Sequence, residues 1–200
     1  PSAAITENMP CRAVAVFDLL HDYSRRLEWD TMLREARFTR GHTSAGVGVT
    51  TLCIGKPLFG IIGIETSYLT FTRGVIAAVE MINKPPFFET FAASIRHQDA
   101  DEGSSVTYRF SFRARPRLLR WLLEPIMLVV LRHETRQRLR ALSRFLASEA
   151  KQVGSGVATR SPSRDLGVDM PPASEHAEQH GPEAVIDLKC LSCLAGEIDE

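Results

Sequence analysis

One stretch of the chain decides the fold: residues 105–146 read SVTYRFSFRARPRLLRWLLEPIMLVVLRHETRQRLRALSRFL. From Val106 to Phe112 every second side chain is apolar or aromatic, and those between are small or charged, which is the pattern of a strand with one buried face. From Pro125 to about Ala147 apolar side chains recur at helical spacing, with arginines on another side. This second pattern predicts a long amphipathic helix whose apolar stripe packs on a one-sided sheet.

The segments before this stretch predict the rest of that sheet. They are rich in β-branched and aromatic residues, and the connections between them are short, so neighbouring strands are expected to be antiparallel. We expect strands at 3–9, 34–40, 47–54, 61–71, 75–82, 87–97 and 105–113. We expect short helices at 13–23, 25–30 and 117–124, with Pro125 as the first residue of the long helix.

Together these elements predict an α+β domain. A curved antiparallel sheet of about seven strands would wrap around the long C-terminal helix, with two short helices after the first strand and an apolar cavity between sheet and long helix. We place this domain at residues 1–150. Residues 151–200 are rich in Gly, Ser, Pro and acidic residues, which predicts a mostly disordered tail. The domain carries a net charge of +5 and the tail a net charge of −5.

The composition argues against several classes of function. No apolar run is long enough to span a membrane. Scattered acids and the missing recognition motif argue against nucleic-acid binding, despite the Arg-rich helix. Phosphate-binding glycine loops and the serine hydrolase motif are missing as well. Four cysteines with one close pair favour a reducing, cytoplasmic setting, and the start at Pro1 is compatible with a removed leader.

The order of these patterns resembles a known superfamily. The residues that carry the resemblance are VFDLLHDYSRRLEWD at 16–30, SVTYRFSFRARPRLLRWLLEP at 105–125 and the helix that follows. They resemble the START-like helix-grip superfamily, which includes the polyketide cyclase/dehydrase and lipid-transport group. The resemblance implies a seven-stranded sheet that grips the long helix around a cavity for lipids, polyketides, sterols, quinones or hormones. Its members range from ligand carriers to cyclases, so the fold does not choose between these functions.

Glu89 and Tyr108 are the candidate catalytic residues, because strand alternation places both on apolar faces. A carboxylate there is costly unless it is paired or its pKa is raised, and Glu89 could then act as a general base or bind a ligand's polar end. The alternative is that a strand bulge turns Glu89 outward or that an arginine pairs with it. Tyr108 could orient a ligand, or could simply pack in the core. The candidate ligand-binding residues are Trp29, Tyr68, Glu89, Phe91, Tyr108, Phe110, Leu128 and Leu131.

The tail contains a spacing that is typical of metal ligands. His176 and His180 are followed by Cys190 and Cys193, and two imidazoles with two thiolates could form a tetrahedral zinc site. The order is reversed from the common zinc finger, and few apolar residues lie between the pairs, so unstructured thiols are the alternative. We expect no metal and no cofactor, and the sequence does not indicate the oligomeric state.

Three functions are compatible with these expectations. The first is binding or transport of a hydrophobic small molecule in the cavity, which requires neither a nucleophile nor a metal. The second is an aromatase/cyclase or dehydratase that uses Glu89 or Tyr108 for acid–base catalysis. The third is lipid exchange at a membrane surface, reached transiently through an edge that contains Arg117, Arg120, Trp121 and Leu122.

Overall fold

The computed structural model describes residues 1–56 and 63–156. In chain order its elements are β1 (Ser2–Met9), α1 (Ala13–His21), α2 (Arg26–Trp29), β2 (Leu33–Phe38), β3 (Thr50–Gly55), β4 (Gly63–Thr72), β5 (Ile76–Met81), β6 (Phe88–Ala100), β7 (Gly103–Ala114), the 3-10 helix η1 (Arg117–Leu119) and α3 (Arg120–Gly156). The seven strands and the first two helices lie where the sequence predicts them, with boundaries that differ by a few residues.

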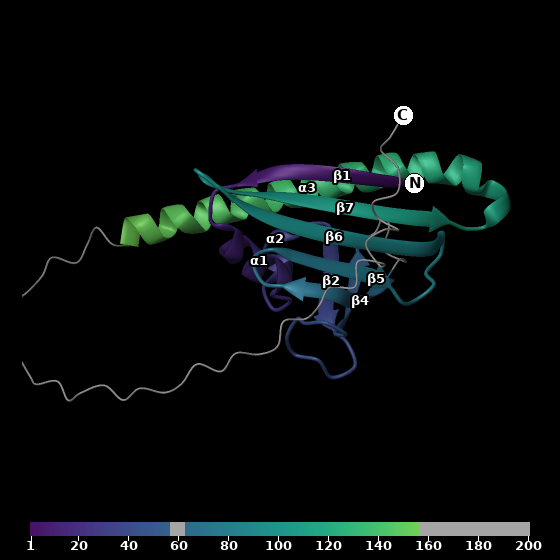
Figure 1. Ribbon diagram of the computed structural model, residues 1–200, viewed down its shortest axis with the longest axis horizontal. Helices are drawn as coiled ribbons and strands as arrows, with labels where there is room; N and C mark the ends of the chain where they lie inside the picture. The colour runs from purple at the N-terminus through teal and green to yellow at the C-terminus, as the bar shows by residue number, and fades with distance from the viewer. Residues whose placement is uncertain (57–62, 157–200) are drawn as a thin grey trace, which may run out of the picture. The chain divides into compact units, whose positions relative to one another are not determined.

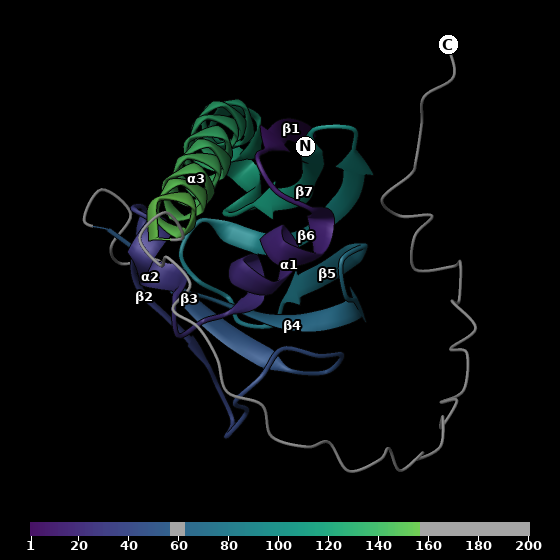
Figure 2. The same cartoon turned by 90° about the vertical axis from the view of Figure 1, so that its left-hand side faces the viewer.

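The strands form one antiparallel sheet in the order β1-β7-β6-β5-β4-β3-β2. The sheet curls strongly, from β1 at one edge round to β2 at the other, and α3 lies across the opening between these edges (Figure 2). Along the sheet, α3 follows β1 and β7 (Figure 1). The predicted α+β helix-grip architecture is therefore confirmed.

The start of α3 differs from the prediction of two separate helices. Residues 117–119 form only a single 3-10 turn, and α3 begins at Arg120 with Pro125 inside it. Pro125 removes one intrahelical hydrogen bond, the one that the carbonyl of Trp121 would accept. That loss is tolerated because Trp121 lies in the first turn and is 77% exposed. At its other end α3 continues to Gly156, past the boundary predicted at residue 150; the predicted tail otherwise falls outside the described residues.

The connection between β6 and β7 is tighter than expected, because the pairing of the two strands continues to Ala100 and Gly103. Gly103 has a φ of +95°, and a Cβ atom there would lie 2.1 Å from the carbonyl oxygen of Met9. Only glycine can therefore make this turn against the end of β1. The turn aligns the two longest strands of the sheet, which supply much of the core.

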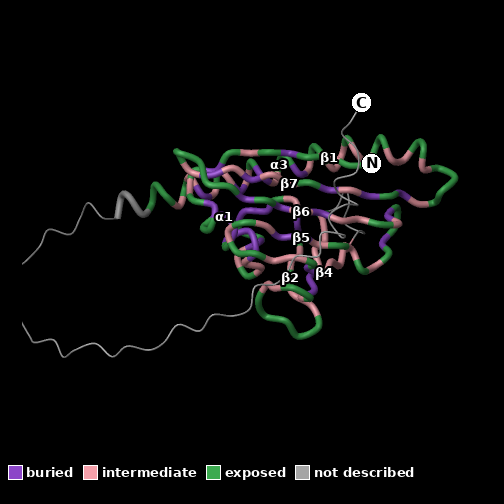
Figure 3. The backbone as a smooth tube through the Cα atoms, in the orientation of Figure 1, coloured by how far each residue is buried: buried purple, intermediate pink, exposed green. Residues whose placement is uncertain are grey.

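The main core lies inside the curl of the sheet. α1 and α2 fill one end of this interior, and the buried face of α3 covers it from the side (Figures 2 and 3). The predicted alternation along β7 is confirmed, since Val106, Phe110 and Phe112 are buried while Arg109 and Arg113 are exposed. The buried residues of this cluster are Ile5, Met9, Val16, Leu19, Leu20, Trp29, Phe88, Ala93, Ile95, Val106, Phe110, Phe112, Leu139, Leu142 and Leu146.

Within the described residues, no helix combines the length and the apolar character that crossing a membrane requires. The helix α3 is long enough, but its sequence carries arginines along much of its length.

Candidate functional site

A cavity of about 580 Å³ lies between the sheet and α3. It occupies the end of the interior that α1 and α2 do not fill. Most of its lining side chains are aliphatic or aromatic, and they come from β2, β3, β4, β6, β7 and α3. The lining residues are Met32, Leu33, Cys53, Gly55, Lys56, Ile64, Phe87, Phe88, Phe91, Tyr108, Phe110, Leu123, Ile126, Met127, Val130, Leu131, Glu134, Thr135 and Arg138. The volume lies in the range of about 300 to 1,000 Å³ that is typical of small-molecule sites.

A buried ion cluster lies next to this cavity and contributes one residue, Arg138, to its lining. The Asp30 carboxylate has no solvent exposure, and its Oδ2 accepts bonds from Nε of Arg26 at 3.1 Å and Nε of Arg138 at 3.0 Å. Burial by itself would raise the pKa of Asp30, but the charges of Arg138 and Arg26 outweigh that effect and lower it. Asp30 is therefore ionised and joins α2 to α3, as expected for an acid that pairs with an arginine.

Tyr108 and Glu134 bring further polar atoms to the cavity. Burial raises the pKa of both residues, because the charged form of each is poorly solvated there. The Tyr108 hydroxyl has no hydrogen-bond partner among the described residues, and it is close enough to feel the charge of Arg138. A ligand that enters the cavity thus meets the Tyr108 hydroxyl, the Glu134 carboxyl group and the Arg138 guanidinium, and Lys56 and Thr135 also contribute to the lining.

The structure brings together four of the predicted ligand-binding residues. Phe91, Tyr108, Phe110 and Leu131 all line the cavity, whereas Leu128 packs against the main core on α3. These four lie on three elements, β6, β7 and α3, which supports the expectation that the binding surface is shared between the sheet and the long helix.

The structure places Trp29 and Tyr68 elsewhere. The indole of Trp29 is 3% exposed in the core, with the guanidinium of Arg26 over its ring at 4.5 Å. Tyr68 lies in a separate aromatic cluster under α1, where its hydroxyl is 2.7 Å from Nδ1 of His21. Both large side chains therefore fill the end of the interior that α1 and α2 occupy, rather than the cavity.

Glu89 points away from the cavity, and both alternatives considered for it occur. A register shift between Phe88 and Thr90 interrupts the alternation of β6, so that Phe88 and Phe91 face the cavity while Glu89 does not. Its carboxylate pairs with Arg117 at 3.0 Å and also with Arg120. The hydrogen bond from Arg117 lowers the pKa of Glu89, which is the opposite of what a general base near neutral pH requires.

Sequence reasoning missed Glu134 and Arg138. Both lie on the stripe of α3 that also carries Leu131, since positions 131, 134 and 138 are spaced by three and four residues. A charge on the apolar side of an amphipathic helix is the signal that could have revealed them. It was hidden by the many other arginines of the same helix, which occupy its exposed side.

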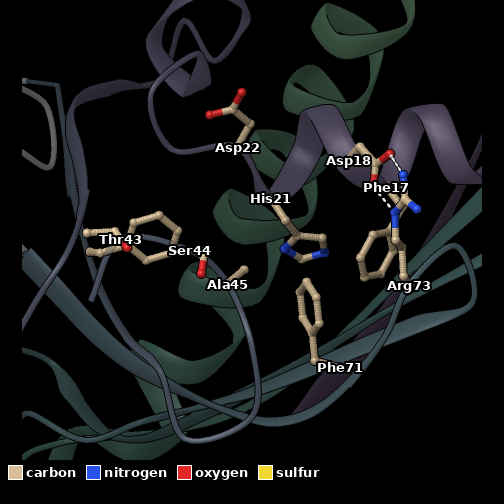
Figure 4. Close-up of a pocket in the computed structure, with 10 residues that line it drawn as sticks. Phe17, Asp18, His21, Asp22, Thr43, Ser44, Ala45, Phe71 and Arg73 are labelled. Atoms are coloured by element: carbon tan, nitrogen blue, oxygen red, sulfur yellow. Dashed lines mark hydrogen bonds and ion pairs between the residues drawn. The ribbon is translucent and has the colours of Figure 1, made fainter. Parts of the chain in front are cut away.

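A smaller hollow of about 270 Å³ lies beside α1 (Figure 4). Phe17, His21 and Phe71 form its aromatic wall, and the exposed ion pair between Asp18 and Arg73 borders it. Burial lowers the pKa of His21 to about 3, so the imidazole is neutral and its bond to Tyr68 ties α1 to β4. This contact explains why Tyr68 is unavailable to the cavity.

The proposed zinc ligands His176, His180, Cys190 and Cys193 lie outside the described residues. Within residues 1–56 and 63–156, no group of three or more His, Cys, Asp or Glu side chains could hold a metal ion.

The fold and the cavity define the class of this protein: it is a START-like helix-grip protein. The sequence profile of one family, described as "Polyketide cyclase / dehydrase and lipid transport", matches residues 3–146. The chain belongs to this family. A comparison with curated proteins found no match.

Several solved structures share the fold at low sequence identity. The protein TTHA0849 from Thermus thermophilus has a TM-score of 0.64 and 9% identity, and the match covers 74% of this chain and 99% of that one. A START superfamily protein from Mycobacterium smegmatis has a TM-score of 0.62 and 6% identity, over 74% and 97% of the two chains. The di-domain ARO/CYC StfQ of the steffimycin biosynthetic pathway has a TM-score of 0.62 and 12% identity, over 75% of this chain and 51% of that one.

Proposed function

We propose that the protein binds a hydrophobic small molecule, such as a lipid, polyketide or quinone, and carries it in the cavity between the sheet and α3. The observation that carries this proposal is the cavity itself, about 580 Å³ in volume and lined mainly by apolar side chains. Burial of a ligand there supplies affinity at about 25 cal/mol per Å² of apolar surface. A few polar side chains orient the ligand, and binding needs neither a nucleophile nor a metal.

Two neighbouring valines of α3 give a matched test. Val130 lines the cavity, whereas Val129 is 68% exposed and does not. We expect Val130→Phe to reduce binding of the neutral dye Nile red several-fold and Val129→Phe to leave it unchanged. Native mass spectrometry of the full chain purified from its host should show a co-purified apolar molecule that is depleted in Val130→Phe. Equal dye binding by both variants and the unaltered protein would contradict the proposal.

A second candidate function is lipid exchange at a membrane surface, and one observation favours it. An apolar edge at the start of α3 is exposed and consists of Phe87, Leu118, Leu119, Trp121, Leu122, Ile126 and Val129. Phe87 and Ile126 also line the cavity, so this edge borders its mouth. Exposed Lys84, Arg113 and Arg117 lie in the flanking segments, and such a combination suits the interface of an anionic bilayer.

The two tryptophans make this candidate testable. Trp121 is 77% exposed and Trp29 is 3% exposed, so a blue shift of emission on adding phosphatidylglycerol vesicles would report on Trp121. We expect co-flotation with these vesicles that Trp121→Ser weakens, and that Leu27→Ser, at an exposed apolar residue on α2, leaves intact. Failure of the full chain to float would exclude membrane exchange but not ligand binding.

Catalysis by a cyclase or dehydratase is a third candidate, favoured by the placement of Tyr108 and Glu134 in the cavity. Tyr108 could polarise a carbonyl group and Glu134, whose pKa is raised by burial, could transfer a proton. We expect Tyr108→Phe to abolish turnover of a poly-β-keto substrate while Nile red uptake persists. Glu89→Gln is the matched control, because Glu89 lies outside the cavity. If no turnover occurs above the uncatalysed rate, this candidate is wrong and the carrier proposal is unaffected.

A further inference from the structure

The ion cluster beside the cavity contains more positive than negative charge. The Asp30 carboxylate is fully buried and contacts the guanidinium groups of Arg26 and Arg138. One negative charge is therefore the counter-charge for two positive charges. Arg26 has a second acceptor besides Asp30, because its Nη1 donates to the carbonyl of Leu20 at 2.6 Å while its Nε donates to Asp30. Its guanidinium also lies over the ring of Trp29. The cluster of Arg26, Asp30 and Arg138 therefore carries one more positive charge than negative charge.

Arg138 is the member of this cluster that faces the cavity. Its side chain is 25% exposed and lines the cavity wall, whereas the Arg26 side chain is 8% exposed and does not. Nε of Arg138 donates a hydrogen bond to Oδ2 of Asp30 at 3.0 Å, and Nη2 forms an ion pair with the same oxygen at 2.8 Å. Its Nη1 has no hydrogen-bond acceptor within the described residues. The guanidinium is thus fixed from behind and offers unused donors, which is the arrangement that binds a planar oxyanion well.

The other charged groups that line the cavity do not cancel this excess positive charge. Lys56 adds a positive charge and Glu134 a negative one to the lining, so with the ion cluster the local sum is +1. Glu134 forms no ion pair with Arg138 within 4 Å among the described residues; burial raises its pKa, and the charges of His133 and Arg138 only partly oppose that effect. The Tyr108 hydroxyl supplies a second donor without a partner to the same cavity.

We infer that the cavity selects amphipathic monocarboxylic acids, whose carboxylate binds Arg138 and Tyr108 while the apolar body packs between Phe91, Phe110 and Leu131. This inference rests on the proposed ligand-binding function and narrows its substrate class. The carboxylate completes the charge balance of the cluster, and no covalent step is involved. A neutral ester of the same shape can accept a hydrogen bond through its carbonyl oxygen, but it supplies no negative charge to balance the cluster, and its bond to Arg138 is weaker than that of a carboxylate.

The test compares parinaric acid, a fluorescent polyene fatty acid, with its methyl ester at about pH 8, where the acid is ionised. We expect the full chain to bind the acid about tenfold more tightly than the ester, as a charge-assisted hydrogen bond would give. Arg138→Gln should abolish this preference, because it weakens the binding of the acid and not that of the ester. Arg138→Lys should retain part of the preference. Arg136→Gln, an exposed arginine of the same helix, should leave the preference unchanged.

The outcomes separate this inference from the proposed function. Equal affinity for acid and ester, or a preference that survives in Arg138→Gln, would overturn the inference while ligand binding still holds. No binding of acid, ester or Nile red would overturn the proposed function itself. Because Arg138→Gln also weakens the contact with Asp30, its thermal unfolding and its Nile red binding are measured in parallel. If Arg138→Gln does not fold, the preference for the acid over the ester is compared between Arg138→Lys, where it should be reduced, and Arg136→Gln, where it should be unchanged.

Discussion

Asp30 connects parts of the chain that are distant in sequence, because its partners Arg26 and Arg138 lie on α2 and α3. Removal of one charge from a buried ion cluster is costly, because each desolvated charge that is left without a partner costs several kcal/mol. The same carboxylate holds Arg138 at the cavity wall. A single residue therefore affects both the stability of the fold and the geometry of the site.

Asp30→Asn should destabilise the protein strongly, because it leaves two neighbouring guanidiniums without a counter-charge. We expect a loss of about 3–5 kcal/mol in the free energy of unfolding, measured by urea denaturation. Asp18→Asn is the matched control, since the Asp18–Arg73 pair is exposed and such pairs contribute about 1 kcal/mol or less. Similar losses in the two variants would show that the buried cluster contributes no more to the free energy of unfolding than an exposed ion pair does.

Two buried histidines should make the stability depend on pH. Burial lowers the pKa of His97 to about 4, and mainly burial, with the charge of Arg26, lowers that of His21 to about 3. The unfolded chain takes up these protons near the ordinary value of about 6.5, so below that pH it binds protons that the folded chain does not. Stability should be full above about pH 6.5 and should fall on acidification, by up to about 1.4 kcal/mol per pH unit for each histidine.

His97→Leu tests this assignment, because both ring nitrogens of His97 are buried without a partner among the described residues. Urea denaturation between about pH 7 and about pH 5 should show a shallower decline for His97→Leu than for the unaltered protein. His42→Leu changes an exposed histidine and should keep the original slope. Parallel declines in all three proteins would rule out His97 as a source of the pH dependence.

At the scale of elements, the sheet depends on a few local departures from regular strands. The register shift in β6 turns Glu89 outward, and the turn at Gly103 brings β7 back against β6 and close to Met9. Strand periodicity predicts the faces of β7 correctly because that strand is regular from Val106 to Phe112. It fails at Glu89 because a bulge inserts one residue, and the pairing that creates a bulge depends on the neighbouring strand.

Gly103→Ala should destabilise the protein more than an ordinary substitution of a glycine with positive φ. At Gly41, which also has a positive φ, an added Cβ meets nothing within 4 Å, so Gly41→Ala should cost only the backbone strain of about 1–2 kcal/mol. Gly103→Ala adds a clash with backbone at Met9 and should cost clearly more. Thermal unfolding of the two variants measures the difference, and equal melting temperatures would contradict the close approach.

At the scale of the whole chain, charge is distributed unevenly along the sequence. Residues 1–156 carry a net charge of +6, and residues 157–200 carry −6. The basic residues include those that flank the apolar edge at the start of α3. Long-range attraction to an anionic surface follows net charge and is screened by salt.

Deletion of residues 157–200 should strengthen binding to phosphatidylglycerol vesicles at low ionic strength, because it changes the net charge from 0 to +6. Co-sedimentation should show more bound protein for the shortened chain, and the difference should shrink as salt is added. The deletion is made after Gly156, where α3 ends. Equal binding of both chains at low salt would show that the acidic residues 157–200 do not screen the positive charge of residues 1–156.

The sequence by itself determined the element order, the antiparallel meander and the amphipathic α3, because these follow from local periodicity and from the lengths of the connections. It also identified Phe91, Tyr108, Phe110 and Leu131 as cavity residues, since regular alternation and helical spacing set their faces. Only the tertiary structure decided that Glu89 is ion-paired outside the cavity, that Tyr68 bonds His21, and that Arg138 lines the cavity. These placements depend on contacts between elements far apart in the chain, where burial and charge pairing outweigh local pattern.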